Sequence, residues 1–123
     1  MTKQRKKLGS EAEEIAAQYL EFHGFKILER NHINKIGEID LIAKDGDIFV
    51  IIEVKSKTGV GRGSPEEMVD QRKQRKLIRT SQAYFMLNEI EEPDFRIDVV
   101  AIELSRQGKL GRIELIENAV GDG

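Results

Sequence analysis

Several residue types are absent or scarce in this chain of 123 residues, and each absence excludes a class of protein or site. There is no cysteine, which excludes disulfides, zinc–thiolate sites and cysteine nucleophiles. There is no tryptophan, and two tyrosines and five phenylalanines do not make an aromatic-rich platform for stacking bases. The apolar runs are far too short to span a bilayer, so we expect no membrane segment.

The start of the chain is basic, but no apolar segment follows it as a secretory signal requires. We therefore expect a cytoplasmic protein. With 39% hydrophobic and 34% charged residues, the composition is typical of a soluble globular protein. The length suits one domain with one core, so we expect a single domain over residues 1–123 in which residues 1–7 form a flexible basic tail.

Charge is distributed unevenly along the chain, although the net charge is only −2. Residues 1–10 and residues 70–80 are strongly basic, whereas acidic residues concentrate elsewhere. Clustered bases in an otherwise acidic chain indicate a surface for phosphate groups, and the alternative is a solvated helix face with a disordered tail. The candidate nucleic-acid-binding residues are Lys3, Arg5, Lys6, Lys7, Arg72, Lys73 and Lys76.

Periodicity and turn signals predict two helices and several strands. The first helix is expected over residues 9–23 and the second from Ser64 to Leu87, with Ser64, Pro65 and Glu67 forming an N-terminal capping signal. A helix between strands implies an α/β fold with a mixed sheet and helices on its faces. The predicted strands are 25–30, the two halves of a hairpin within 37–55, 95–104 and 113–119.

The best functional clue is the predicted hairpin, in which two apolar runs flank the dipeptide Asp45-Gly46. This dipeptide is a strong signal for a two-residue type I′ turn. With Lys44 and Asp47 closing that turn, the numbers of paired residues sum to 91. This register fixes which side chains we expect to meet across the two strands.

In this register, three carboxylates and one lysine lie on the same face of the hairpin. Glu38 lies opposite Glu53, Asp40 shares the face of Glu38, and Lys55 shares the face of Glu53. One lysine does not balance three close carboxylates, whereas a hard divalent cation does. The alternative is a solvated open face, but residues 48–54 are apolar apart from Glu53, and such strands are normally buried on both faces.

Two polar residues interrupt the amphipathic pattern of the predicted helices. Glu13 falls at the edge of the apolar stripe of the first helix, where its carboxylate can reach a site at the sheet edge. Lys73 lies on the apolar line of the second helix, which is an uncommon place for lysine. Lys73 either points at phosphate or at the carboxylates, or its stem snorkels along the apolar surface. For Glu13, the alternative is an ordinary glutamate at the boundary of the helix.

The order of these motifs resembles a known family. Asp40 followed by Glu53-Val54-Lys55 resembles the PD-(D/E)XK nuclease superfamily, although Ile39 stands in place of the proline of that name. Over residues 8–104 the chain is similar to the YraN-like bacterial family of small nuclease-fold proteins. The segments that carry this similarity are Gly9-Ser10-Glu11-Ala12-Glu13, Tyr19-Leu20, Gly24-Phe25, Arg30-Asn31, Gly37-Glu38-Ile39-Asp40, Glu53-Val54-Lys55, Lys73 and Arg96-Ile97-Asp98-Val99-Val100.

The resemblance implies a restriction-endonuclease-like fold with a mixed central sheet, and metal-dependent hydrolysis of phosphodiester bonds. It implies Mg²⁺ or Mn²⁺ as the cofactor. Lys55 would orient the nucleophile or stabilise developing negative charge, and Lys73 would contact phosphate. The implied catalytic residues are Asp40, Glu53 and Lys55. The implied metal ligands are Asp40, Glu53, Glu13, Glu38 and the carbonyl of Val54.

The resemblance also implies a nucleic-acid partner, with DNA favoured over RNA. Holliday-junction resolvases of this superfamily carry a glutamate on their first helix, which points to branched or structured DNA by analogy of fold. A homodimer is compatible with cutting both strands, although the sequence shows no interface. Two other functions stay open: a nuclease fold that binds nucleic acid without cutting it, and a protein-interaction domain.

Overall fold

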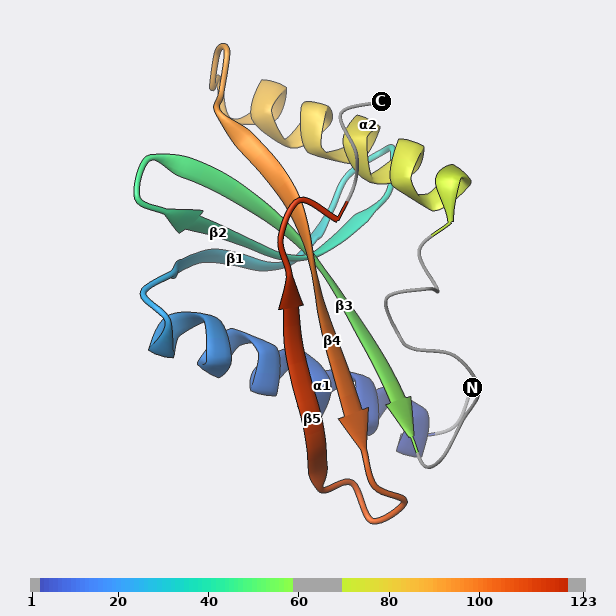
Figure 1. Ribbon diagram of the computed structural model, residues 1–123. Coiled ribbons are helices and arrows are strands. Elements are labelled where there is room, and N and C mark those ends of the chain that lie inside the picture. The colour runs from blue at the N-terminus through green and yellow to red at the C-terminus, as the bar shows by residue number, and fades with distance from the viewer. Residues whose placement is uncertain (1–2, 59–69, 120–123) are drawn as a thin grey trace.

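A central β-sheet with helices packed on its two faces forms the described part of the protein (Figure 1). The computed structural model describes residues 3–58 and 70–119, with side chains from residue 11 onward. This is the α/β class predicted from the sequence, and it is consistent with a restriction-endonuclease-like fold. In chain order the elements are α1 (Lys3–Phe22), β1 (Lys26–Ile33), β2 (Glu38–Asp45), β3 (Ile48–Thr58), α2 (Gln71–Leu87), β4 (Phe95–Leu104) and β5 (Leu110–Ile116).

The sheet is mixed, as predicted, and its strand order follows the chain from β1 to β5. Neighbouring strands are antiparallel except β3 and β4, which pair in parallel from Phe49↔Phe95 to Thr58↔Leu104. Parallel neighbours need a crossover connection, and α2 lies in that connection. The crossover therefore brings the basic helix α2 over the strands that carry the predicted acidic residues.

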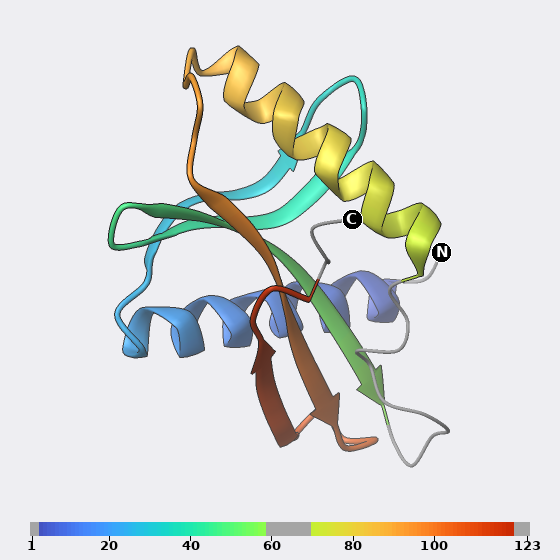
Figure 2. The same ribbon diagram turned by 45° about the horizontal axis from the view of Figure 1, so that its top comes forward.

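The helices α1 and α2 lie on opposite sides of the sheet (Figure 2). A hydrophobic cluster on each side holds its helix in place. The α1-side cluster includes Val50 and Ile52, whereas the α2-side cluster includes Ile51. Alternate side chains of β3 are thus buried on opposite faces, which confirms the prediction of a strand buried on both sides. The α2-side cluster also contains Leu77 and Phe85 of α2, so this helix is fixed against the sheet by apolar packing.

The predicted register of the hairpin was wrong by two residues. Asp45 pairs with Ile48, so the turn residues are Gly46 and Asp47 and paired numbers sum to 93. Gly46 has φ 62°, whereas Asp45 and Asp47 are not among the residues with positive φ, which fits a type II′ turn and not type I′. Because side chains alternate with a period of two, the shift changes the partners but keeps the predicted faces along the paired stretch from Leu41 to Asp45.

Element boundaries also differ from the prediction in three places. α1 begins at Lys3 and not at Gly9, so residues 3–7, expected to be a tail, belong to the helix. Lysine, arginine and glutamine are good helix formers, which explains the earlier start. β1 continues to Ile33 because its pairing with β2 runs that far, and β5 begins at Leu110.

The helix α2 begins at Gln71, later than the predicted start. Asp70 is its N-cap, because the Asp70 side chain accepts a hydrogen bond from the backbone N–H of Lys73 at 2.9 Å. The capping signal predicted at Ser64 lies outside the described residues. Among the helices that the structure describes, none has the length and apolar character needed to cross a membrane.

Candidate functional site

The strands β2 and β3 separate next to the predicted acidic residues Asp40 and Glu53. The last pair of their ladder is Leu41↔Ile52. Ile39 belongs to the α2-side cluster and Leu41 to the α1-side cluster, although residues two apart in a regular strand share one face. The backbone of β2 therefore rotates through Asp40, at the point where its pairing with β3 stops.

Asp40 replaces the missing backbone partner at this point. Its Oδ2 accepts a hydrogen bond from the backbone N–H of Val54 at 2.8 Å. A buried N–H without an acceptor is unfavourable, so this carboxylate oxygen acts in place of a strand carbonyl. The Val54 side chain packs against the α1-side cluster. Among the described residues, none donates a hydrogen bond to the second oxygen, Oδ1, of Asp40.

Glu53 is a nearly buried carboxylate that contacts two lysines. It is 8% exposed, and its Oε1 lies 3.2 Å from Nζ of Lys55 and 3.4 Å from Nζ of Lys73. Lys55 follows on the same strand and face, and its side chain is 13% exposed. Lys73 reaches Glu53 from the first turn of α2 with a side chain that is 43% exposed. Lys55 is thus enclosed within the site, whereas Lys73 lies at its rim.

The charges of this cluster are closely coupled. Burial raises the pKa of Asp40 to about 7, and the negative charge of Glu53 adds to the rise. Burial lowers the pKa of Lys55, and the neighbouring Lys73 lowers it further, against the attraction of Glu53. Burial also disfavours the charge of Lys73, but its contacts with Lys55 and Glu53 outweigh burial and raise its pKa. Among the described residues Asp40 forms no ion pair, and the charge of Lys55 offsets only part of the rise in its pKa.

A pocket of about 370 Å³ lies beside these groups, between the β2–β3 split and α2. It joins three of the predicted acidic residues to two of the predicted basic ones. Leu77 and Thr80 were not predicted as part of a site, because neither residue type stands out in an amphipathic helix. The residues that line the pocket are Gly37, Glu38, Asp40, Glu53, Lys73, Lys76, Leu77 and Thr80.

Other predicted site residues lie outside the lining of this pocket, including Val54 and also Lys55, which reaches the site through its contact with Glu53. Glu13 on α1 is close enough to feel the charge of Glu53; burial raises its pKa, while a hydrogen bond with Asn31 lowers it. Arg72 is exposed on α2. The remaining predicted basic residues have side chains outside the described part of the chain: Lys3, Arg5, Lys6 and Lys7.

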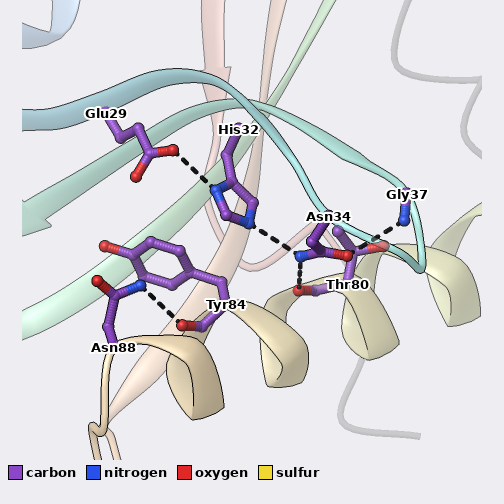
Figure 3. Close-up of polar contacts among 7 residues, drawn as sticks. All are labelled: Glu29, His32, Asn34, Gly37, Thr80, Tyr84 and Asn88. Atoms are coloured by element: carbon purple, nitrogen blue, oxygen red, sulfur yellow. Dashed lines mark hydrogen bonds and ion pairs between the residues drawn. The ribbon is translucent and has the colours of Figure 1, made fainter.

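The loop between β1 and β2 is attached to α2 at the rim of the pocket (Figure 3). Oδ1 of Asn34 accepts the backbone N–H of Ile36 at 2.9 Å and of Gly37 at 3.3 Å, while its Nδ2 donates to the carbonyl of Thr80 at 3.2 Å. A Cβ added to Gly37 would lie 2.9 Å from Oγ1 of Thr80 and 3.1 Å from Cε of Lys76. Glycine at this position therefore allows the loop to approach the helix.

A buried histidine extends this attachment (Figure 3). Nδ2 of Asn34 is 2.9 Å from Nε2 of His32, and Nδ1 of His32 is 2.7 Å from Oε2 of Glu29. Because Oδ1 of Asn34 already accepts backbone N–H groups, Nδ2 is the donor and Nε2 of His32 is the acceptor. The His32 ring also packs edge-on against Tyr84, with ring centroids 5.0 Å apart. Sequence reasoning missed this network.

Asp98 is another buried carboxylate, but its partners are structural. It is fully buried, and Nε of Arg96 lies 3.1 Å from each of its oxygens. The backbone N–H of Asn118 also donates to Asp98 at 2.8 Å, and Arg96 reaches Asp45 at 3.2 Å. This motif therefore ties β4 to the hairpin turn and to the segment after β5, and it does not enter the pocket.

The donor set of the pocket fits a hard divalent cation. Asp40 and Glu53 supply carboxylate oxygens on one wall, and Mg²⁺ takes one or two carboxylates while it keeps several waters. Among the side chains that the structure describes, in residues 11–58 and 70–119, no three acidic or histidine groups gather closely enough to hold a metal by themselves.

These features define a small α/β protein with a mixed sheet and a charged pocket where two strands separate. The profile of the family described as "Uncharacterised protein family UPF0102" matches residues 12–102, so the chain belongs to this family. The predicted membership of the YraN-like family is thereby confirmed. The matched stretch includes the pocket residues of β2, β3 and α2.

Relatives from distant bacteria align over most of this chain. The UPF0102 protein of Persephonella marina is 45% identical over 94 residues, which cover 76% of this chain and 81% of the relative. The UPF0102 protein of Clostridium botulinum (strain Loch Maree / Type A3) is 44% identical over 115 residues, or 93% and 94% of the two chains. That of Pelotomaculum thermopropionicum is 40% identical over 119 residues, or 97% and 99%.

Proposed function

We propose that this protein is a metal-dependent nuclease that hydrolyses phosphodiester bonds, with branched or structured DNA as its substrate class. The observation that carries this proposal is that Asp40 and Glu53 line one pocket together with lysines of α2, while Lys55 contacts Glu53 from within the sheet. Carboxylates suit a divalent cation, and lysines suit the phosphate that the cation would share.

Asp40 and Glu53 would hold Mg²⁺ or Mn²⁺, with Glu38 at the edge of the pocket and Glu13 acting through water. Once bound, the cation supplies charge neutralisation at the scissile phosphate and acidifies the attacking water. Asp40 is oriented for this task because its Oδ2 is fixed by the Val54 N–H, which leaves Oδ1 for ligation. The backbone N–H of Val54 thus orients Asp40, and the backbone carbonyl of Val54 would be a metal ligand, as the family resemblance implies.

Lys55 is the residue we assign to stabilising negative charge that develops on the phosphate. Its side chain is mostly enclosed, so its ammonium group is already positioned beside Glu53 before substrate enters. Lys73 and Lys76 line the outer part of the pocket and would contact phosphate groups of the bound strand. Exposed Arg72 on the same helix would add sequence-independent attraction.

A second candidate function has one observation in its favour. The two lysine contacts of Glu53 compensate its charge without a cation. The same pocket could therefore bind phosphate as a nucleic-acid-binding module that does not cut. Cleavage and binding must accordingly be measured separately on the same set of substrates.

The test is a single-turnover cleavage panel of labelled single-stranded, duplex and branched DNA and of RNA, with Mg²⁺ or Mn²⁺. The wild type should cut at least one form, and Asp40→Asn should slow that reaction by at least about 100-fold. Asparagine retains an oxygen acceptor for the Val54 N–H, so folding is preserved. Asp47→Asn, at the exposed hairpin turn, is the matched control and should cut at the wild-type rate.

Two outcomes would contradict the nuclease proposal. Equal cleavage by wild type and Asp40→Asn would show that the activity does not come from this pocket. Binding of a substrate by the wild type without cleavage of any form, with either cation, would favour the non-catalytic binding module.

A further inference from the structure

We infer that Lys73 acts as an internal counter-ion, whose ammonium group occupies the place of the cation at Glu53. Binding of the metal would then free Lys73 from Glu53 and allow it to contact a substrate phosphate. This inference rests on the proposed function and concerns the control of that same site. In this role, Lys73 weakens the affinity of the site for a metal and strengthens its affinity for nucleic acid.

The geometry of Glu53 is the first support for this inference. Both lysine contacts fall on one oxygen, Oε1, at 3.2 Å from Lys55 and 3.4 Å from Lys73. Lys55 is enclosed and belongs to the same strand as Glu53, so it has little freedom to leave. Lys73 comes from the opposite helix and is far more exposed, so it is the contact that can exchange.

The position of Lys73 on α2 makes such an exchange a side-chain movement alone. Its backbone N–H is held by the carboxylate of Asp70 at the N-cap. The side chain can therefore change rotamer without disturbing the helix, and rotamer changes of exposed side chains take picoseconds to nanoseconds. Metal exchange at Glu53 needs no rearrangement of the fold.

Electrostatics gives the direction of the coupling. A divalent cation at Glu53 would lie next to the ammonium group of Lys73, and like charges at that separation repel. Lys73 would then move into the pocket that it lines, where a substrate phosphate offers a new partner. Because coupling between two binding events is reciprocal, the cation should also strengthen phosphate binding.

Lys76 provides a matched comparison for Lys73. It lies on the same helix, lines the same pocket and carries the same charge. Among the described residues, however, it forms no ion pair with a carboxylate. A general effect of positive charge in the pocket would involve both lysines, whereas the proposed exchange involves Lys73 alone.

The experiment is a calorimetric titration of Mn²⁺ into the full chain without nucleic acid. Four proteins are compared: wild type, Lys73→Gln, Lys73→Arg and Lys76→Gln. We expect Lys73→Gln to bind Mn²⁺ about three- to tenfold more tightly than wild type, given the usual strength of partly exposed ion pairs. Lys73→Arg keeps the charge and should stay within about twofold of wild type, as should Lys76→Gln.

The results separate failure of this inference from failure of the proposed function. If the wild type binds Mn²⁺ and Lys73→Gln binds it no more tightly than Lys76→Gln, the counter-ion role is wrong and the nuclease proposal is unaffected. If none of the four proteins binds Mn²⁺ at millimolar concentration, the metal site itself is refuted, and the inference with it. Circular dichroism of each variant verifies that the fold is retained.

Discussion

Asp40 serves both the fold and the proposed chemistry. Its Oδ2 closes the end of the β2–β3 ladder through the Val54 N–H, while its side chain lines the pocket. Burial and the negative charge of Glu53 hold its pKa far above the usual value. An ionised Asp40 therefore lowers the stability of the metal-free protein, and a cation or a proton removes this unfavourable charge.

We predict that Asp40→Asn stabilises the metal-free protein at neutral and higher pH. The folded pKa of about 7 exceeds the ordinary value of 3.8, so the folded state holds a proton that the unfolded state has lost. The free energy of unfolding then falls as pH rises from about 4 to 7, and asparagine removes this loss. Urea unfolding at pH 8 should show a gain on the order of 1–3 kcal/mol for the variant.

Measurement at two pH values provides the control for this prediction. At pH 4 the side chain of Asp40 is protonated in the folded protein, so wild type and Asp40→Asn should have nearly equal stability. Asp47→Asn at the exposed turn should show no such difference between the two pH values. A variant no more stable than wild type at pH 8 would show that Asp40 carries its charge without penalty.

At the residue scale, the sequence could predict which carboxylates meet, but not how they are held. Alternation along the strands predicted that Glu38, Asp40 and Glu53 gather on one face, and all three line one pocket, although β2 rotates at Asp40. The hydrogen bond from Val54 to Asp40 depends on the separation of β2 and β3, which no local pattern encodes. The pairing of Lys73 with Glu53 likewise depends on where α2 packs.

At the scale of the elements, the loop–helix attachment determines how α2 stands over the pocket. Gly37 is the tightest point, because a Cβ there would approach Oγ1 of Thr80. We predict that Gly37→Ala destabilises the protein by about 1–2 kcal/mol, since the loop and α2 must move apart. Thr80→Ala in the same chain should recover part of this loss, and thermal or urea unfolding measures both changes.

A double-mutant cycle tests whether this contact is the cause. The single variant Thr80→Ala loses the hydrogen bond from its hydroxyl to the carbonyl of Lys76, so it has a cost of its own. If the steric contact matters, the combined variant is more stable than the sum of the two single changes predicts. Strict additivity would show that Gly37→Ala acts through the backbone of the loop and not through α2.

The elements themselves were more predictable than their ends and their contacts. Periodicity and β-propensity identified the strands and the helices, because apolar residues follow the two sides of one sheet. The predicted start of α2 at Ser64 was too early, because Asp70 is itself a good N-cap and the helix begins directly after it, at Gln71. The contact of Asn34 with Thr80 joins residues 46 positions apart, and nothing in a polar loop indicates such a partner.

At the scale of the whole molecule, the order of elements places the basic side chains of α2 over the acidic side chains of the sheet. The connection between parallel strands β3 and β4 contains α2, so its lysines lie over the strand that carries Glu53. The α/β class and the mixed sheet followed from the alternation of helix and strands, and the family match agrees with the motifs. The two helices pack against opposite faces of the sheet, and among the described residues the pocket is lined by side chains of α2 and not of α1.

The most direct test of the central claim is a crystal structure of the protein grown with Mn²⁺, in which the ion is located by its anomalous scattering. We expect a peak in the pocket, within about 2.5 Å of carboxylate oxygens of both Asp40 and Glu53. We also expect Nζ of Lys73 to have moved off Glu53, while Lys55 stays in contact. A peak elsewhere on the chain, or none at millimolar Mn²⁺, would contradict the assignment of this pocket as a metal-dependent active site.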